Sequence, residues 1–250
     1  DRTRSGLNGL RPGHQMGRQC DYQHFLWWWP PALSRVCARA LEEGIEVDYV
    51  RTLIRQRNLS PEGTAVPTWP WRFRVQTLGN FRVLRHDEPL GGAGKAQRRP
   101  LELLKLLYAC GGTQVSEGRI TDALWPRIDG DSAHRSFTSA LHRLRKLLGE
   151  DKAIVLHEGK LTLDRRYFWV DAWAFDALAA RLDSASDPAQ VEKLAERMLA
   201  LYAGPFMSDE PDAPWALQPR ERMRSRLARA MKRVLRQWHD GGDAERARAG

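Results

Sequence analysis

The chain has 250 residues, 42% of them hydrophobic, and a formal net charge of +9, which allows one large domain or two to three small ones with ordinary cores. Its three cysteines (Cys20, Cys37 and Cys110) are too few and too scattered for a disulfide framework. No run of about 18 apolar residues occurs, so no membrane span is indicated.

The positive charge is concentrated in the middle of the chain. Residues 72–166 hold 18 basic and 11 acidic side chains, whereas residues 167–250 hold 13 of each. A surplus of one sign confined to one segment favours a polyanionic partner for that segment.

The first 71 residues predict a tail, a helical hairpin and a linker. Residues 1–24 are rich in Arg, Gly and Gln with little periodicity, which is typical of a loop. Apolar residues at three- and four-residue spacing then predict helices over 31–43 and 47–58. We interpret residues 1–58 as the end of an upstream domain of a longer protein. Residues 59–71, with three prolines, are the predicted linker.

From residue 72 the period changes to two, and short antiparallel strands are predicted on either side of Gly79-Asn80. Pro100 begins a predicted helix that ends at Gly111-Gly112. Ser116 is the predicted N-cap of a second helix, which ends at Trp125-Pro126.

A third helix is predicted over residues 131–148, with Asp131 and Ser132 as N-cap residues and Gly149 just past its end. One face is an apolar stripe made of Ala133, Phe137, Ala140, Leu141, Leu144 and Leu148. The opposite face carries Arg135, Ser136, Ser139, His142, Arg143 and Lys146, with Arg145 on its flank. A solvated helix face normally mixes both signs of charge, and this face has no acidic residue. Such a face suits phosphates and base edges.

A hairpin is predicted next, over residues 154–163, with its turn at Glu158-Gly159. The order of elements is therefore strands, three helices and a hairpin. A helix-turn-helix followed by a hairpin indicates a winged helix-turn-helix.

Short motifs in this region resemble a known class of regulator. Leu78-Gly79-Asn80-Phe81, the run from Arg99 to Leu104, Ala123-Leu124-Trp125-Pro126 and the run from Leu144 to Gly149 resemble the OmpR-type winged-helix domain of the SARP class. Trp169-Val170-Asp171, Leu201 to Phe206, Ala213-Pro214-Trp215 and Arg220-Glu221-Arg222 resemble the bacterial transcriptional activator domain that follows it.

The resemblance implies a mainly α fold with small β sheets. A winged helix with N-terminal antiparallel strands, three helices and a C-terminal hairpin wing would occupy residues 72–166. A truncated activator domain of helical repeats, similar to tetratricopeptide repeats, would occupy residues 167–250.

The resemblance also implies roles for individual residues, with helix 131–148 in the major groove and wing 154–163 in the minor groove. Arg143 and Ser139 would lie at base edges, and Ser136 could reach bases or phosphates. Lys160 at the wing tip would enter the minor groove. The candidate phosphate contacts are Arg135, His142, Arg145 and Lys146. An intramolecular ion pair is the alternative for Arg145, and simple solvent exposure is the alternative for His142.

The implied partner is double-stranded DNA, bound by a monomer or a dimer. RNA polymerase is a candidate partner of the loop Arg127–Asp131, and the repeats would contact a protein or another part of the same chain. We expect no cofactor, metal or catalytic site, no membrane partner and a cytoplasmic location. Two alternatives remain open: a protein-interaction scaffold that never binds DNA, and a fragment of a larger ATPase-type regulator.

Overall fold

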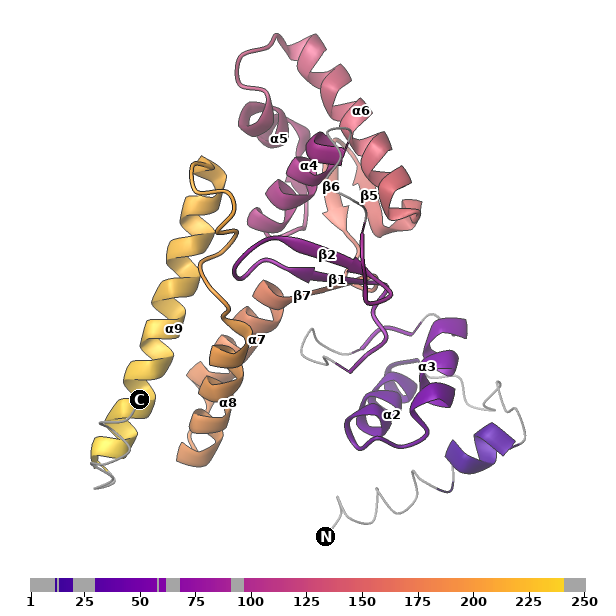
Figure 1. The fold of residues 1–250 in the computed structure, drawn as a ribbon, viewed down its shortest axis with the longest axis vertical. Helices are drawn as coiled ribbons and strands as arrows, with labels where there is room; N and C mark the ends of the chain where they lie inside the picture. The colour runs from indigo at the N-terminus through magenta and orange to yellow at the C-terminus, as the bar shows by residue number, and fades with distance from the viewer. Residues whose placement is uncertain are drawn as a thin grey trace. The chain divides into compact units, whose positions relative to one another are not determined.

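A computed structural model describes residue 12 and residues 14–19, 30–57, 59–61, 68–90 and 97–240 (Figure 1). The chain divides into two compact units, Asp1–Arg72 and Phe73–Gly250. Residues 62–67 of the predicted linker and residues 241–250 of the predicted activator domain lie outside the described residues.

The first unit contains the predicted helical hairpin, formed by α2 (Pro30–Glu42) and α3 (Val47–Gln56). Gly44 adopts a φ of +66°, and the Ile45 N–H donates to the Ala40 carbonyl at 2.8 Å, which ends α2. The apolar faces of the two helices are buried on each other. Burial raises the pKa of the Cys37 thiol to about 12, so this cysteine is a small core residue.

The prediction of a loop throughout residues 1–24 is wrong for residues 14–19, which are helical. Tertiary contacts explain the difference. The His14 ring lies edge-on to Tyr49 of α3 with centroids 6.2 Å apart, and Arg18 Nε is 2.9 Å from a carboxylate oxygen of Glu46. Contacts of this kind can stabilise a short helix that local periodicity does not indicate.

The second unit begins with a four-stranded sheet in the order β3-β2-β1-β7. Its strands are β1 (Phe73–Gln76), β2 (Arg82–Arg85), β3 (Glu88–Pro89) and β7 (Phe168–Val170). The predicted antiparallel pair, β1 with β2, is confirmed. The parallel pairing of β7 with β1 was not predicted, and it places Phe168 against Phe73 with ring centroids 5.1 Å apart.

The predicted order of three helices and a hairpin is confirmed. The elements are α4 (Arg98–Ala109), β4 (Val115–Ser116), α5 (Glu117–Leu124), α6 (Gly130–Leu148), a short 3₁₀ turn (Asp151–Ala153), β5 (Ile154–His157) and β6 (Lys160–Leu163). Strand β4 joins the hairpin in a three-stranded sheet of order β4-β6-β5. Ser116 caps α5 as predicted, by accepting a hydrogen bond from the Arg119 N–H.

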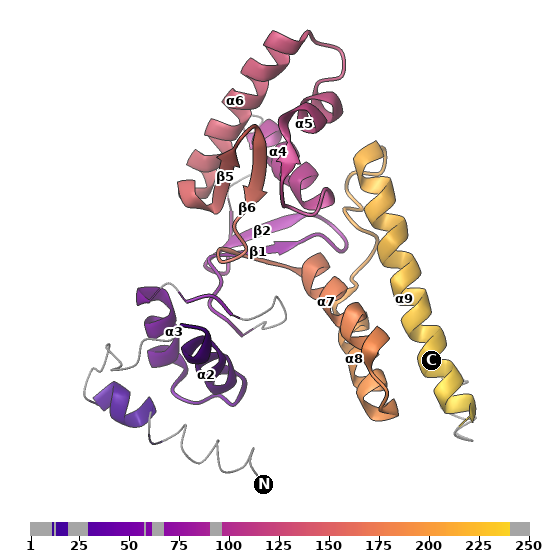
Figure 2. The same cartoon turned by 180° about the vertical axis from the view of Figure 1, so that it is seen from behind.

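Three further helices follow: α7 (Asp171–Ser184), α8 (Pro188–Leu201) and α9 (Pro214–Asp240). Figures 1 and 2 show α7 and α8 on one side of the four-stranded sheet, and α4, α5, α6 and the wing on the other. Helix α9 packs on α7 and α8 and reaches α4. Within the second unit, one continuous apolar core joins the winged helix to the helices that follow it, from Phe137 of α6 to Phe175 of α7. No helix among the described residues is both long and apolar enough to cross a membrane.

Candidate nucleic-acid interface

Helix α6 presents its polar face to solvent because its apolar stripe fills the core. All six residues of the predicted stripe are buried. The helix begins one residue earlier than predicted, at Gly130, and its N-cap is Asp129 instead of Asp131 or Ser132. The Asp129 carboxylate accepts a hydrogen bond from the Ser132 N–H at 3.0 Å, which lowers the pKa of Asp129. Gly149 ends the helix as predicted, with a φ of +64°.

The structure places most of the predicted DNA-contacting residues on this exposed face. The exposed residues are Arg135, Ser139, His142, Arg143, Lys146 and, on the wing, Lys160. Ser136 and Arg145 are half-buried. In Figures 1 and 2, α6 lies at the far end of the second unit from α8, so the helices of the C-terminal half leave this face open.

Four of these residues meet in one surface hollow of about 480 Å³ beside α6. The lining residues are Arg99, Trp125, Ser132, Arg135, Ser136, Ser139, Ala140 and Arg143. Three guanidinium groups and three serine hydroxyls therefore surround the hollow, and none of the described residues that line it is acidic. Guanidinium and hydroxyl donors are the groups that bind phosphate oxygens in proteins.

Arg145 differs from the other predicted contacts because its guanidinium is already bound within the protein. Its Nη2 and Nε donate to the Ile154 carbonyl at 2.9 and 3.3 Å, which ties the end of α6 to the first residue of the wing. The partner is a backbone carbonyl instead of the carboxylate that the alternative expected, and the phosphate contact of Arg145 stays a prediction. Arg145 braces the wing against α6.

The wing is a regular hairpin whose turn holds Lys160 outward. Glu158 and Gly159 have φ values of +48° and +69°. Positive φ at both central residues is what a two-residue type I′ hairpin turn requires. Lys160 pairs with His157 across the turn, and both side chains are exposed. The hairpin is anchored at its other end by Ile154 and Leu163, which pair with each other and are buried.

A side-chain hydrogen bond that the sequence did not reveal joins the two helices of the helix-turn-helix. Nδ1 of His134 on α6 contacts a carboxylate oxygen of Glu117 on α5. The two residues are 17 positions apart, and no local motif links them. Arg99 and Trp125, which also line the hollow, were not predicted there, because each lies outside α6.

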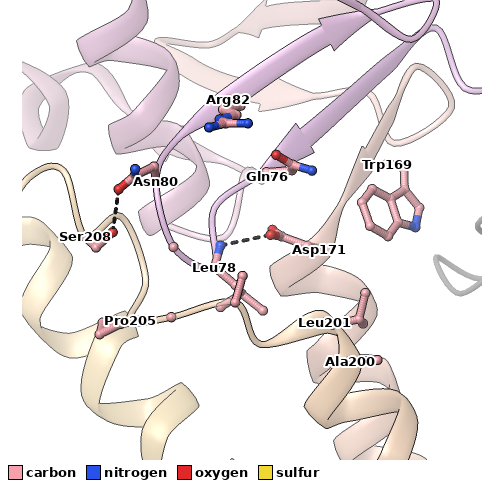
Figure 3. A pocket seen from close by; sticks show the side chains of 13 residues that line it. Gln76, Leu78, Asn80, Arg82, Trp169, Asp171, Ala200, Leu201, Pro205 and Ser208 are labelled. Atoms are coloured by element: carbon pink, nitrogen blue, oxygen red, sulfur yellow. Dashed lines mark hydrogen bonds between the residues drawn. The ribbon is translucent and has the colours of Figure 1, made fainter.

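A second structural feature joins the winged helix to the helices that follow it (Figure 3). The carboxylate of Asp171 accepts hydrogen bonds from the N–H groups of Thr77, Leu78 and Ala172 and from the Thr77 hydroxyl. Burial raises the pKa of Asp171, and these four donors offset only part of the effect.

The segment after β1 also pairs with the loop between α8 and α9. The Gly79 N–H donates to the Pro205 carbonyl at 3.0 Å, and the Ser208 N–H donates to the Gly79 carbonyl at 2.9 Å. The Ser208 hydroxyl bonds to the Asn80 side-chain oxygen at 2.8 Å (Figure 3). A hollow of about 530 Å³ lies along this contact. We call the contact between residues 77–80 and residues 205–208, together with Asp171, the seam.

Lys105 of α4 adds an ionic contact next to the seam. Its Nζ lies 2.8 Å from Asp209 and 2.6 Å from Glu210, and the lysine is only 8% exposed. Burial alone would lower the pKa of Lys105, but the hydrogen bonds and charges of the two carboxylates outweigh it and raise the pKa. The first helix of the winged helix is therefore bound directly to the loop that precedes α9.

No group of three or more His, Cys, Asp or Glu side chains in the described part of the chain is placed to hold a metal ion. The fold and the open basic face define the class of protein: a winged helix-turn-helix joined to a helical domain.

Comparison with known proteins matches part of the chain to a known family. Residues 170–249 match the family described as "Bacterial transcriptional activator domain". Over 162 residues the chain is 27% identical to the regulatory protein AfsR of Streptomyces griseus, covering 64% of this chain and 16% of that protein. The fold resembles that of Mycobacterium tuberculosis EmbR, solved in complex with a low-affinity phosphopeptide. That match has a TM-score of 0.57 at 19% identity and covers 71% of this chain and 48% of the EmbR chain.

The chain thus spans a small part of the AfsR length and about half of the EmbR chain. Residues 170–249 match the activator-domain family, and the chain as a whole resembles SARP-class regulators, in which a winged helix precedes that domain. The predicted family and fold class are confirmed.

Proposed function

We propose that this protein regulates bacterial transcription by binding specific DNA sequences, with α6 in the major groove and the β5–β6 wing in the neighbouring minor groove. The observation that carries the proposal is the polar face of α6 from Arg135 to Lys146, which is largely exposed, basic and free of acidic side chains. The match of residues 170–249 to the bacterial transcriptional activator domain and the similarity to AfsR support it.

In this proposal the exposed residues divide between recognition and positioning. Arg143 reads a base edge and can donate to a guanine through two N–H groups, a contact worth about 1–3 kcal/mol of discrimination. Ser139 lies one turn before it and faces an adjacent base. Lys160 enters the minor groove from the wing tip.

The remaining polar residues contact the DNA backbone and set the register of the helix on the duplex. Arg135, Ser136, His142 and Lys146 have this role. Arg145 positions the wing through Ile154, and only the part of its guanidinium that does not bind Ile154 would reach a phosphate.

A regulator of this kind acts in the bacterial cytoplasm, together with RNA polymerase. The exposed turn before α6 is the proposed polymerase contact: Ile128 within it is 43% exposed, although it is an isoleucine. The predicted loop Arg127–Asp131 is shorter in the structure, because Gly130 and Asp131 already belong to α6.

Salt dependence tests this function against the alternative of a protein-interaction scaffold. The full chain is titrated against a fluorescent duplex pool between 50 and 200 mM salt, with anisotropy as the readout. Neutralising 6–10 phosphates predicts that affinity falls by about 10³–10⁵-fold over this range. Absence of binding at low salt would exclude the DNA-binding function and favour the scaffold.

A further inference from the structure

We propose that the hollow beside α6 seats a phosphate group of the DNA backbone, and that Arg99 of α4 is one of its ligands. The inference rests on the proposed function and adds to it a contact from an element other than the recognition helix and the wing. Its ligand is a phosphodiester of the bound duplex.

The hollow is lined by cationic and hydroxyl side chains. Arg99 is contributed by α4, whereas Arg135 and Arg143 come from α6, so cationic groups from two helices converge on one space. Every other polar side chain among the described lining residues, apart from the Trp125 indole, is a serine. A guanidinium presents a planar fork of N–H donors that matches two phosphate oxygens.

Two of the arginines, Arg99 and Arg135, are held by contacts within the protein. Nη1 of Arg99 lies 2.7 Å from one oxygen of Glu102, which leaves the other guanidinium N–H groups for a ligand. Nη2 of Arg135 donates to the Ser132 hydroxyl at 2.9 Å, on the same helix. These contacts reduce the freedom of both side chains before any ligand binds, and a site that is ordered in advance binds at a lower entropic cost.

The hollow also lies next to the part of α6 that is proposed to enter the major groove. The hollow opens beside Ser139 and Arg143, the residues proposed to read bases. A duplex whose major groove receives α6 has its phosphates along both edges of the groove. A phosphate at one edge would lie between α6 and the start of α4, where the hollow is. Arg135 and Arg99 would then hold it from two sides while Arg143 remains turned to the bases.

Arg98 supplies a matched control. It is the neighbour of Arg99, it contacts the same carboxylate with its Nε 2.9 Å from the other oxygen of Glu102, and it does not line the hollow. Replacing either arginine by glutamine removes one positive charge and one ion pair with Glu102. Any difference between the two variants in DNA binding therefore reports the hollow itself.

The experiment measures the affinity of the full chain and of the variants Arg99→Gln and Arg98→Gln for a duplex selected by the wild type, as a function of salt. We expect Arg99→Gln to weaken binding and to reduce the slope of log K against log[salt] by about 0.9, the loss of one phosphate contact. Arg98→Gln should keep the wild-type slope. Both variants should select the same base sequence, because a phosphate contact carries no direct sequence information.

Replacing single phosphates of the duplex by neutral methylphosphonates completes the test. One position should weaken the wild type and Arg98→Gln but leave Arg99→Gln nearly unchanged, since removing the second partner of a contact costs little after the first is gone. Equal slopes for the two variants, or an altered base preference in Arg99→Gln, would overturn the inference. Failure of the wild type to bind any duplex would instead overturn the proposed function.

Discussion

The carboxylate of Asp171 accepts three hydrogen bonds from Thr77: two from its N–H, at 2.8 and 2.9 Å, and one from its hydroxyl, at 2.6 Å. Asp171 is the first residue of α7, and Thr77 follows the last residue of β1. The two residues are 94 positions apart in the chain. Asp171 is 4% exposed and Thr77 is fully buried. It fixes the helical domain to the central sheet of the winged helix.

We expect Asp171→Asn to destabilise the protein by about 2–3 kcal/mol, because the amide nitrogen would face N–H donors that now bind a carboxylate oxygen. Thr77→Val removes the hydroxyl alone and should cost less, about 1–2 kcal/mol. Urea denaturation of the full chain measures both. A loss below about 0.5 kcal/mol for Asp171→Asn would contradict the structural role of the seam.

The ion pair of Lys105 with Asp209 makes a pH-dependent contribution to stability. Burial alone would raise the pKa of Asp209, but hydrogen bonds from Lys105 and from the Phe81 N–H, together with the lysine charge, lower it. A carboxylate with a lowered folded-state pKa stabilises the fold above its unfolded value near 3.8 and loses this contribution as the pH falls through the folded value. Lys105, whose pKa is raised, contributes below about 10.5 and loses its contribution in stronger base.

Lys105→Met should therefore reduce stability at pH 7 by about 2 kcal/mol, the value of a hydrogen-bonded charged group. The variant should also lose less stability than the wild type as the pH falls below about 3.8, the unfolded-state pKa of Asp209. Denaturant titrations of both proteins at several pH values test this. Parallel stability curves would show that the pair does not contribute to acid sensitivity.

Gly79 and Gly204 face each other across the seam, and each meets a different requirement. Gly79 has a φ of +104°, which disfavours any other residue, and a Cβ on Gly204 would lie 3.4 Å from the Gly79 Cα. We expect Gly79→Ala to cost about 1–3 kcal/mol through backbone strain. Gly118 is the control, since it lies in α5 with open space around its Cα. Gly118→Ala should stabilise by up to about 1 kcal/mol, and thermal unfolding distinguishes the two.

The seam also shows where sequence reasoning ends. The motifs around Leu78, Trp169 and Phe206 are visible as a family resemblance, but nothing in the local pattern indicates that they meet. Strand β7 is only three residues long, and its pairing with β1 depends on a contact across about 95 residues. Periodicity reports which face of an element is apolar, and it does not report which distant element covers that face.

Helix α6 was more accessible to prediction because its signals are local. The apolar stripe, the basic face and Gly149 lie within 20 residues, and the structure confirms all three. Its N-cap was misassigned because Asp129, Asp131 and Ser132 are all good capping residues, and only the geometry selects Asp129. The place of Arg99 at the hollow could not be predicted, since two adjacent arginines at the start of α4 do not indicate which other helix they face.

Arg145 and Lys146 are adjacent and should respond differently to substitution. Arg145→Gln removes the hydrogen bonds to the Ile154 carbonyl and should cost about 1 kcal/mol of stability. Lys146→Gln removes an exposed charge and should leave stability unchanged within about 0.5 kcal/mol. Denaturation curves separate these outcomes. DNA titrations should show a reduced salt slope for Lys146→Gln, and an unchanged slope would remove Lys146 from the proposed phosphate contacts.

The measurement that tests sequence-specific recognition most directly is selection of duplexes from a randomised pool by the full chain and by Arg143→Ala, followed by sequencing. We expect the wild type to enrich one motif, and Arg143→Ala to relax the preference at one guanine while keeping much of its salt-sensitive affinity. Salt-sensitive binding by the wild type without an enriched motif would contradict sequence-specific recognition, and an identical motif from both proteins would remove Arg143 from base readout.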